Sequence, residues 1–182
     1  MPEGNNGKKF MHNVRLMLEA WTGGQFQLER RPGKGDLVGP VDFPFLVECK
    51  DQRTWKLDHF LKGNVQLGKP SPVAKYLLQV LKDCRDADHV KAPLLILTKP
   101  FSPIYVCTFL FIFDCMLLSD NYTPRLEFPV VSLGGKRIPF GFALFEARFI
   151  FDSPYNRMRG FFEQEVTLDR VRSNVRMLTS RR

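Results

Sequence analysis

The sequence has 182 residues, of which 44% are hydrophobic and 13% aromatic. This composition excludes a disordered chain and is most simply that of one folded domain. The formal net charge of +8 favours a polyanionic partner such as nucleic acid or an acidic membrane surface. The longest apolar run, residues 104–118, contains Asp114 and is too short for a membrane span, so no membrane insertion is expected.

Cysteine usage indicates a reducing compartment. The four cysteines form no Cys-x-x-Cys pair and lie within apolar or helical patterns: Cys49, Cys84, Cys107 and Cys115. The sequence shows no signal peptide, and disulfides are rare in cytosolic proteins. We therefore expect a cytoplasmic protein with free thiols.

The first part of the chain predicts one helix followed by three strands. Apolar residues recur at helical spacing from residue 8 to residue 21, and Gly23 and Gly24 end this helix. Residues 25–30 alternate weakly, as in a first strand. Residues 36–39 predict a second strand, which a turn at 40–44 pairs with the following FLVECK strand. This pairing brings Asp36 close to Glu48.

The remaining elements predict an α/β fold with a mixed central sheet flanked by helices. A short helix at 54–62 precedes a clear amphipathic helix that begins near Pro72 and ends near Ala87. Two apolar runs, 92–98 and 104–108, suit central strands. Residues 109–118 fit either a strand or a buried helix. Further on, 137–152 predict one or two strands and 161–178 a helix.

The most informative stretch is FPFLVECKDQ, residues 43–52. Side chains of a strand alternate between faces, so Glu48 and Lys50 share one face and the Cys49 side chain takes the other. An unpaired charge at the end of a buried strand costs several kcal/mol of desolvation. Either the two charges form a structural ion pair and Asp36 is an ordinary turn residue, or the charges serve a bound ligand.

The second interpretation predicts a phosphodiester hydrolase. Two carboxylates from adjacent strands, Asp36 and Glu48, supply the oxygen ligands that Mg²⁺ prefers, and Mn²⁺ can substitute. The backbone carbonyl of Cys49 is a further candidate ligand. Lys50 is placed to orient or help deprotonate an attacking water and to offset charge on the phosphate.

Positive charge brackets this predicted site. Three basic residues precede Asp36 and three follow the Glu-Cys-Lys triplet: Arg30, Arg31, Lys34, Arg53, Lys56 and Lys62. Each alone fits a solvated surface, but as a set beside paired acids they favour salt-dependent contacts with DNA phosphates. Trp55 fits either stacking at a DNA branch point or buried packing.

The strings RRPGKGDLVG, FLVECKDQ, TWKLDHFLKG and APLLILTK resemble the PD-(D/E)XK nuclease superfamily over residues 7–108, especially Holliday-junction-resolvase-like endonucleases of phages. The resemblance implies a restriction-endonuclease-like mixed sheet flanked by helices. It also implies that Asp36 and Glu48 bind the metal, that Lys50 is the catalytic lysine, and that Gln79 supports the site from the following helix.

The first helix departs from the family pattern. Many of these nucleases carry an early glutamate there, where this chain has Met11 or His12. Glu19, two turns later, is a candidate metal ligand in its place, or else an i,i+4 partner of Arg15. Fewer protein ligands for the metal, or a DNA-binding module without catalysis, are the remaining alternatives.

The resemblance implies an endodeoxyribonuclease for branched DNA, and a homodimer, because a junction is cut at two related strands. A repair or restriction-type nuclease for duplex or flapped DNA would use the same site. We expect a nuclease core over residues 1–124 and a C-terminal α+β addition over 125–182. The addition, which also fits as part of the same domain, is the candidate for dimerisation or DNA clamping.

Overall fold

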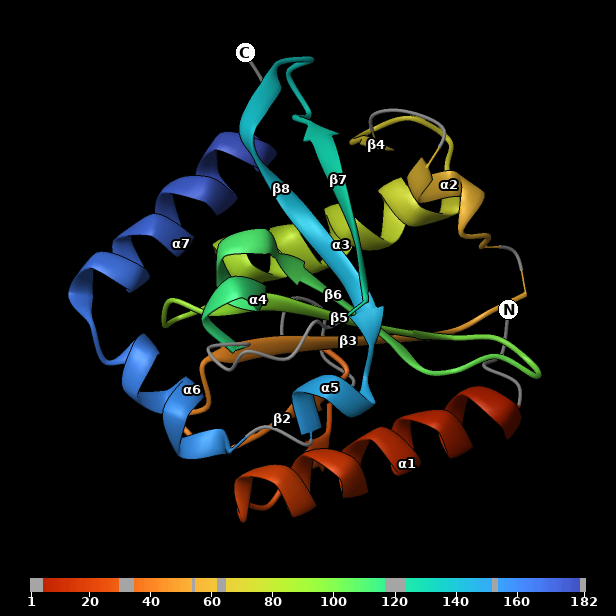
Figure 1. The fold of residues 1–182 in the computed structure, drawn as a ribbon, viewed down its shortest axis with the longest axis vertical. Coiled ribbons are helices and arrows are strands. Elements are labelled where there is room, and N and C mark those ends of the chain that lie inside the picture. Colours follow the sequence, from red (N-terminus) through yellow and green to blue (C-terminus); the bar gives the residue numbers. More distant parts are fainter. Residues whose placement is uncertain are drawn as a thin grey trace.

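The structure is a computed structural model that describes the chain except residues 1–4, 30–34, 54, 62–64, 117–123, 152–153 and 181–182 (Figure 1). The helices are α1 Asn5–Thr22, α2 Asp58–Leu61, α3 Pro72–Asp86, α4 Leu110–Met116, α5 Arg148–Phe151, α6 Tyr155–Phe162 and α7 Glu165–Thr179. The strands are β1 Gln27–Leu28, β2 Leu37–Val38, β3 Phe45–Asp51, β4 Val65–Gln66, β5 Ala92–Thr98, β6 Tyr105–Phe109, β7 Arg125–Val131 and β8 Arg137–Glu146.

One mixed sheet organises the fold, with the strand order β1-β2-β3-β5-β6-β8-β7-β4. The pairs β3–β5 and β4–β7 are parallel, and the other neighbours are antiparallel. β5 is buried along nearly its whole length, as expected for a central parallel strand made of apolar residues. The predicted mixed central sheet flanked by helices is therefore confirmed.

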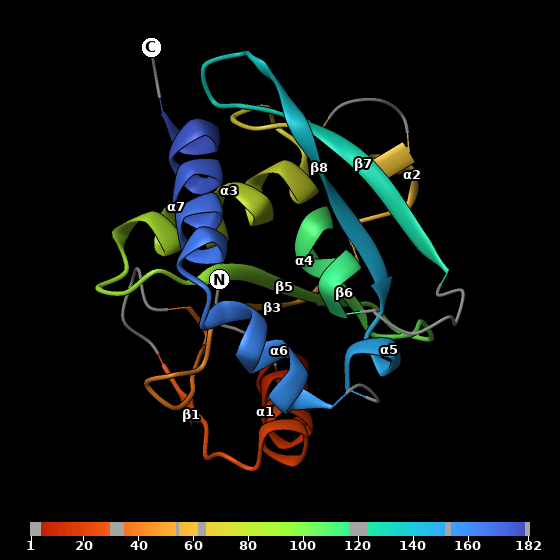
Figure 2. The same cartoon turned by 60° about the vertical axis from the view of Figure 1, so that its left-hand side comes forward.

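Helices cover the sheet on both sides of β3. In both views α1 lies on one side of β3 and α3 on the other (Figures 1 and 2). α1 contributes Phe10, Val14 and Leu18 to the core, and α3 contributes a buried row that includes Leu77 and Leu81. α7 packs on α3 and forms an outer layer. β3 is thus enclosed by helices, and polar groups on it need partners.

The C-terminal region joins the same sheet. β8 pairs with β6 on one side and with β7 on the other. Its Phe142 is completely buried and contacts Phe109 of β6 and Phe128 of β7, with ring centroids 4.9 Å and 5.9 Å away. Residues beyond 124 therefore complete the central sheet and its helical cover.

Several elements differ from those expected from the sequence. Within the segment 109–118 the structure describes a helix, α4, over Leu110–Met116, and the predicted helix at 54–62 is only the single turn α2. The predicted 161–178 helix is two helices, α6 and α7, while β8 ends at Glu146 and is followed by α5. The four cysteines are free, as expected.

Two strands, β4 and β7, were missed by the sequence prediction. β7 is only partly buried and carries Pro129, which has no N–H to donate and lies where the pairing register shifts. β4 has two residues and acquires its strand geometry by pairing with β7. Neither segment shows a strong local strand pattern, and neighbouring strands decide its conformation. Within the described residues, no helix is long and apolar enough to cross a membrane.

Candidate active site

Asp36 and Glu48 meet through the antiparallel pairing of β2 with β3. Leu37 is the partner of Val47, so Asp36, one residue earlier, comes opposite Glu48. The Asp36 N–H donates to the Val47 carbonyl at 2.8 Å, and the Asp36 carboxylate accepts a bond from the Cys49 N–H at 2.7 Å. Directly opposed residues of an antiparallel pair share a face. The two hydrogen bonds therefore hold the Asp36 carboxylate beside Glu48.

Glu48 and Lys50 lie on the α3 face of β3. The Glu48 side chain is 1% exposed and forms an ion pair with the Lys50 ammonium, which is 18% exposed. The Lys50 ammonium contacts Oε1 of Glu48 itself, so this oxygen is engaged by the ion pair. The ion pair predicted as the structural alternative is thus present.

The pKa values of the pair follow from its burial and its neighbours. The pKa of Glu48 is raised to about 7, first by burial and then by the charge of Asp36, against the opposing effect of Lys50. Burial by itself lowers the pKa of Lys50, but the Glu48 carboxylate outweighs this and the net pKa is raised. Lys50 is therefore an ammonium at neutral pH, whereas Glu48 is partly protonated at that pH.

A third acid, Asp83 on α3, lies within electrostatic range of these residues and was missed by sequence analysis. Burial raises the pKa of Asp83, the charges of Asp86 and Asp36 raise it further, and Lys50 lowers it. Asp83 in turn raises the pKa of Glu48. Its position four residues after Gln79 was the available signal, because i and i+4 side chains share a helix face.

The same helix face carries Tyr76 and Gln79. The Tyr76 hydroxyl donates to Oε1 of Gln52 at 2.5 Å, and the Lys50 ammonium lies 5.9 Å from the centre of the Tyr76 ring. Tyr76 is buried, and Gln79 is exposed one turn further along the helix, between Tyr76 and Asp83. α3 thus places a tyrosine and an acid near the charges on β3, with the exposed Gln79 between them on the helix.

Glu19 occupies a different position. Its Oε1 accepts a hydrogen bond from the Phe26 N–H at 3.0 Å, which ties the end of α1 to the segment before β1. His12 is exposed, with its Nδ1 3.5 Å from the Arg15 guanidinium. Neither side chain is brought into contact with Asp36 or Glu48 by an interaction in the described structure.

The predicted DNA contacts divide into two groups. Arg53 and Lys56 are exposed beyond the end of β3. The other four, Arg30, Arg31, Lys34 and Lys62, lie outside the described residues. Trp55 is fully buried, donates its indole N–H to the Thr98 carbonyl at 3.0 Å and packs against Phe60, which establishes the packing interpretation for it.

The donor set at this site fits a hard divalent cation. Asp36 and Glu48 offer carboxylate oxygens, and the Glu48 carboxylate also contacts the Lys50 ammonium. The Cys49 N–H points at Asp36, and strand geometry turns the Cys49 carbonyl towards the same edge. Burial raises the pKa of the Cys49 thiol well above its ordinary value, so the sulfur stays protonated. Among the described residues, no three His, Cys, Asp or Glu side chains are grouped to hold a metal.

A mixed sheet with an aspartate beside a Glu-x-Lys strand is the arrangement of the PD-(D/E)XK nuclease superfamily. The chain belongs to one family within it, described as "Phage putative PDDEXK endonuclease", whose model matches residues 4–111, more than half of the sequence. No curated protein and no solved structure matches the chain. The comparison therefore assigns the chain to a family of nucleases.

Proposed function

We propose that this protein is a metal-dependent endodeoxyribonuclease that hydrolyses phosphodiester bonds in branched DNA, as Holliday junction resolvases do. The observation that carries the proposal is the carboxylate of Asp36, held by β3 backbone hydrogen bonds beside the buried Glu48. The net charge of +8 supports a polyanionic substrate. The resemblance to phage junction resolvases supports the branched substrate.

Each side chain has a role in this proposal. Asp36, Glu48 and the Cys49 carbonyl would hold Mg²⁺, for which Mn²⁺ can substitute, and a cation held there would supply positive charge for the phosphate and for water activation. Lys50 orients the attacking water and offsets charge on the phosphate through its Nζ. Because the pKa of Lys50 is raised, we assign it the ammonium form and not the role of base.

Supporting roles fall to residues of α3. Gln79 is exposed on the same helix face as Asp83, where its amide can hydrogen-bond to a phosphate or a water. Asp83 acts on the charges of Glu48 and Asp36 without forming with them a three-carboxylate group, so we assign it to water-mediated contacts at the metal site. Arg53 and Lys56 contact DNA phosphates beyond the end of β3.

Lys50→Ala tests the proposal. The change removes the ammonium but leaves the metal ligands, so we expect cleavage to fall by at least about 10²-fold while DNA affinity stays within a few-fold. Cleavage is measured on four-way junctions, flaps and linear duplex with Mg²⁺, with Mn²⁺ and with EDTA. Affinity is measured on the same DNA with EDTA.

The matched control is Lys56→Ala, which removes an exposed lysine away from Asp36, Glu48 and Lys50 and is expected to reduce affinity slightly without affecting the chemical step. Equal losses of cleavage and affinity in Lys50→Ala would contradict the role given to Lys50. A preference for flaps or duplex over junctions would replace the resolvase assignment by a repair or restriction-type nuclease.

A DNA-binding module without catalysis is the second candidate. It is favoured by the Glu48–Lys50 ion pair and by the lack of a three-residue metal-binding group in the described part of the chain. Binding of all DNA forms with no cleavage in either metal would establish this alternative.

Resolvase activity further implies a homodimer, because two related strands are cut. The mass of the protein in solution, free and bound to a four-way junction, tests this point. A monomer that still cuts both strands in one binding event would contradict it.

A further inference from the structure

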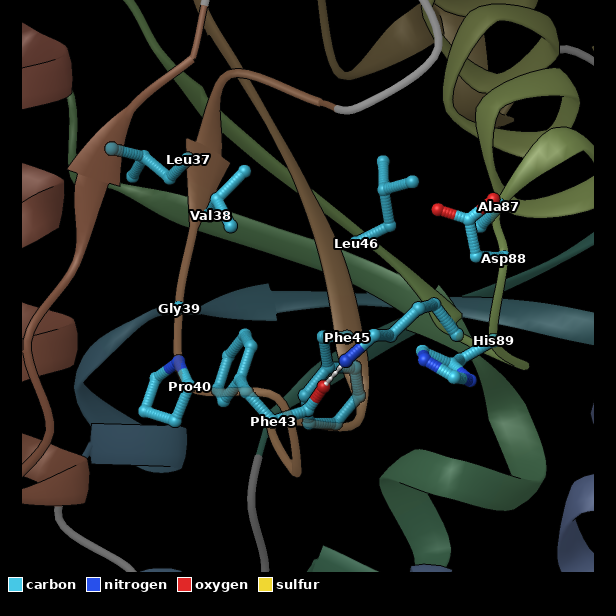
Figure 3. Close-up of a pocket in the computed structure, with 11 residues that line it drawn as sticks. Leu37, Val38, Gly39, Pro40, Phe43, Phe45, Leu46, Ala87, Asp88 and His89 are labelled. Atoms are coloured by element: carbon cyan, nitrogen blue, oxygen red, sulfur yellow. Dashed lines mark hydrogen bonds between the residues drawn. The ribbon is translucent and has the colours of Figure 1, made fainter.

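A pocket lies near the N-terminal end of β3 (Figure 3). It has a volume of about 120 Å³ and is bounded by β2, the start of β3 and the segment after α3. Figure 3 shows Val38 and Pro40 on one side and Asp88 and His89 on the other, with Leu46 between them. The pocket is therefore apolar inside and polar at one edge.

The pocket adjoins the proposed active site on three elements. Leu37 follows Asp36 directly in the chain. Leu46 lies two residues before Glu48 on the same strand face, about 6.8 Å away along the strand. Ala87 follows Asp83 by one helical turn, about 6 Å along the axis. A nucleotide whose phosphate lies at the acids can thus extend its sugar and base into the pocket.

The pocket lining suits a nucleobase. The side chains of Val38, Pro40 and Leu46 provide apolar contacts for the faces of a base, while the rings of Phe43 and Phe45 pack in the core behind the pocket. Asp88 and His89 are exposed at the edge, where they can hydrogen-bond to the polar edge of a base. Lys91 donates to the carbonyls of Val41 and Phe43 and so fixes the floor of the pocket.

A second groove, of about 210 Å³, lies on the other side of the segment from Ala87 to Lys91. Its far wall is α7, which contributes Arg172 and Arg176. These arginines are one helical turn apart, so their like charges repel each other. Arg172 pairs with Asp169 at 2.5 Å, which offsets only one of the two charges. A phosphate placed between the arginines would relieve the repulsion.

We propose that the two hollows form one track for an unpaired DNA strand. The nucleotide next to the scissile phosphate places its base in the apolar pocket, and the strand then crosses residues 87–91 and sets its phosphates on Arg172 and Arg176. The inference rests on the proposed nuclease function and narrows its substrate to DNA in which the nucleotide beside the cut is unpaired, as in a fork or flap, or can leave its pair at the branch point of a four-way junction. A paired base cannot enter the pocket, because its partner and stacked neighbours would collide with the walls.

The pocket is tested with abasic DNA and with a variant that fills it. An abasic site at the nucleotide beside the cut should weaken binding to forked DNA by roughly tenfold, since a stacked base contributes about that factor. Val38→Trp, at a 41% exposed position, should cause the same loss on forked DNA and leave fully paired duplex unaffected. In this variant the abasic site should have no further effect.

Controls and a second variant keep the test decisive. Val166→Trp introduces the same side chain at an exposed position that lines neither hollow, and should change nothing. If Val38→Trp does not fold, His89→Ala tests the polar edge of the pocket. This variant should weaken the binding of forked DNA by a few-fold and leave the binding of duplex DNA unchanged. The pocket assignment would be overturned if a pocket variant weakened the binding of duplex and forked DNA equally. It would also be overturned if the abasic site had no effect on binding to the unaltered protein.

The second half of the track is tested by salt dependence. Each phosphate contact on a single strand contributes about 0.7 to the slope of log affinity against log salt. Arg172→Gln with Arg176→Gln should therefore reduce the slope by about 1.4 on forked DNA. Arg125→Gln with Arg148→Gln makes the same charge change outside both hollows and should leave the slope unaltered.

All binding is measured with EDTA, so the result does not depend on cleavage. Binding that follows the track predictions without any cleavage would retain the track and reject the nuclease proposal. Metal-dependent cleavage with equal slopes for the two arginine pairs would retain the nuclease and reject the track.

Discussion

At the residue scale, the carboxyl group of Glu48 links protonation to folding. The group is 1% exposed, and its pKa is raised from 4.5 to about 7, chiefly by burial. The folded protein therefore binds this proton more tightly than the unfolded chain does, and unfolding releases it between these two pH values. It follows that the free energy of unfolding falls as pH rises from 4.5 to 7, in total by on the order of 3 kcal/mol.

Glu48→Gln should remove this component of the pH dependence, because the amide does not titrate. Urea unfolding of the metal-free protein from pH 4.5 to 8 gives the measurement. As pH rises, the free energy of unfolding of the variant should increase relative to that of the original protein. Glu163→Gln, at an exposed glutamate, should keep the original profile. A Glu48→Gln profile parallel to that of the original protein would contradict the raised pKa.

At the element scale, the entry into β2 positions Asp36. The preceding Gly35 has φ +74°, and a Cβ built there would lie 2.6 Å from the Val47 carbonyl oxygen. Both the backbone angle and the close approach to β3 require glycine. This glycine therefore allows the hydrogen bonds that hold the Asp36 carboxylate beside Glu48.

Gly35→Ala should destabilise the protein by about 2–3 kcal/mol and weaken the increase in melting temperature caused by Mn²⁺, because Asp36 is displaced. Gly135→Ala is the control, since Gly135 has φ +81° but no atom within 4 Å of its added Cβ, so only about 1 kcal/mol is expected. Calorimetry of both variants with and without Mn²⁺ tests this. Identical behaviour of the two variants would show that β2 does not depend on the close contact.

At the scale of the whole molecule, the segment beyond residue 124 stabilises the sheet that carries the site. β8 covers the edge of β6, and α7 covers α3, which faces Glu48 and Lys50. Loss of this segment would expose the apolar β6 edge and the outer surface of α3. The active-site face of β3 would then lose the support behind its helical lining.

A chain that ends at residue 124 should therefore show no cooperative thermal unfolding and should aggregate. Circular dichroism on heating, combined with light scattering, provides the measurement. Cooperative unfolding of this shortened chain, together with metal-dependent DNA cleavage, would instead establish an independent core over residues 1–124.

Local sequence patterns were sufficient for the strongest elements. The apolar spacing from Pro72 to Asp86 and the apolar run from Ala92 to Thr98 predicted α3 and β5 closely. The turn signals at 40–44 predicted the β2–β3 pairing, and with it the approach of Asp36 to Glu48. These features depend on near neighbours in the chain, where periodicity and turn chemistry are informative.

Other features depend on residues far apart in the sequence. β7 and β4 have weak patterns of their own and form by pairing within the sheet, and α4 is a helix although its residues suit a strand equally well. Asp83 was missed because nothing local separates it from other acids of a helix surface. Its significance depends on how α3 lies against β3.

The sequence by itself determined that this chain carries an acid beside a Glu-x-Lys strand, on a basic α/β protein of the PD-(D/E)XK type. Strand alternation and turn chemistry depend on residues that are neighbours in the chain, so they can be predicted from the sequence. Only the tertiary structure decided the burial of Glu48, the electrostatic role of Asp83 and the two hollows on either side of residues 87–91. Burial, charge coupling and cavity shape arise from elements that meet in space, and no spacing along the chain encodes them.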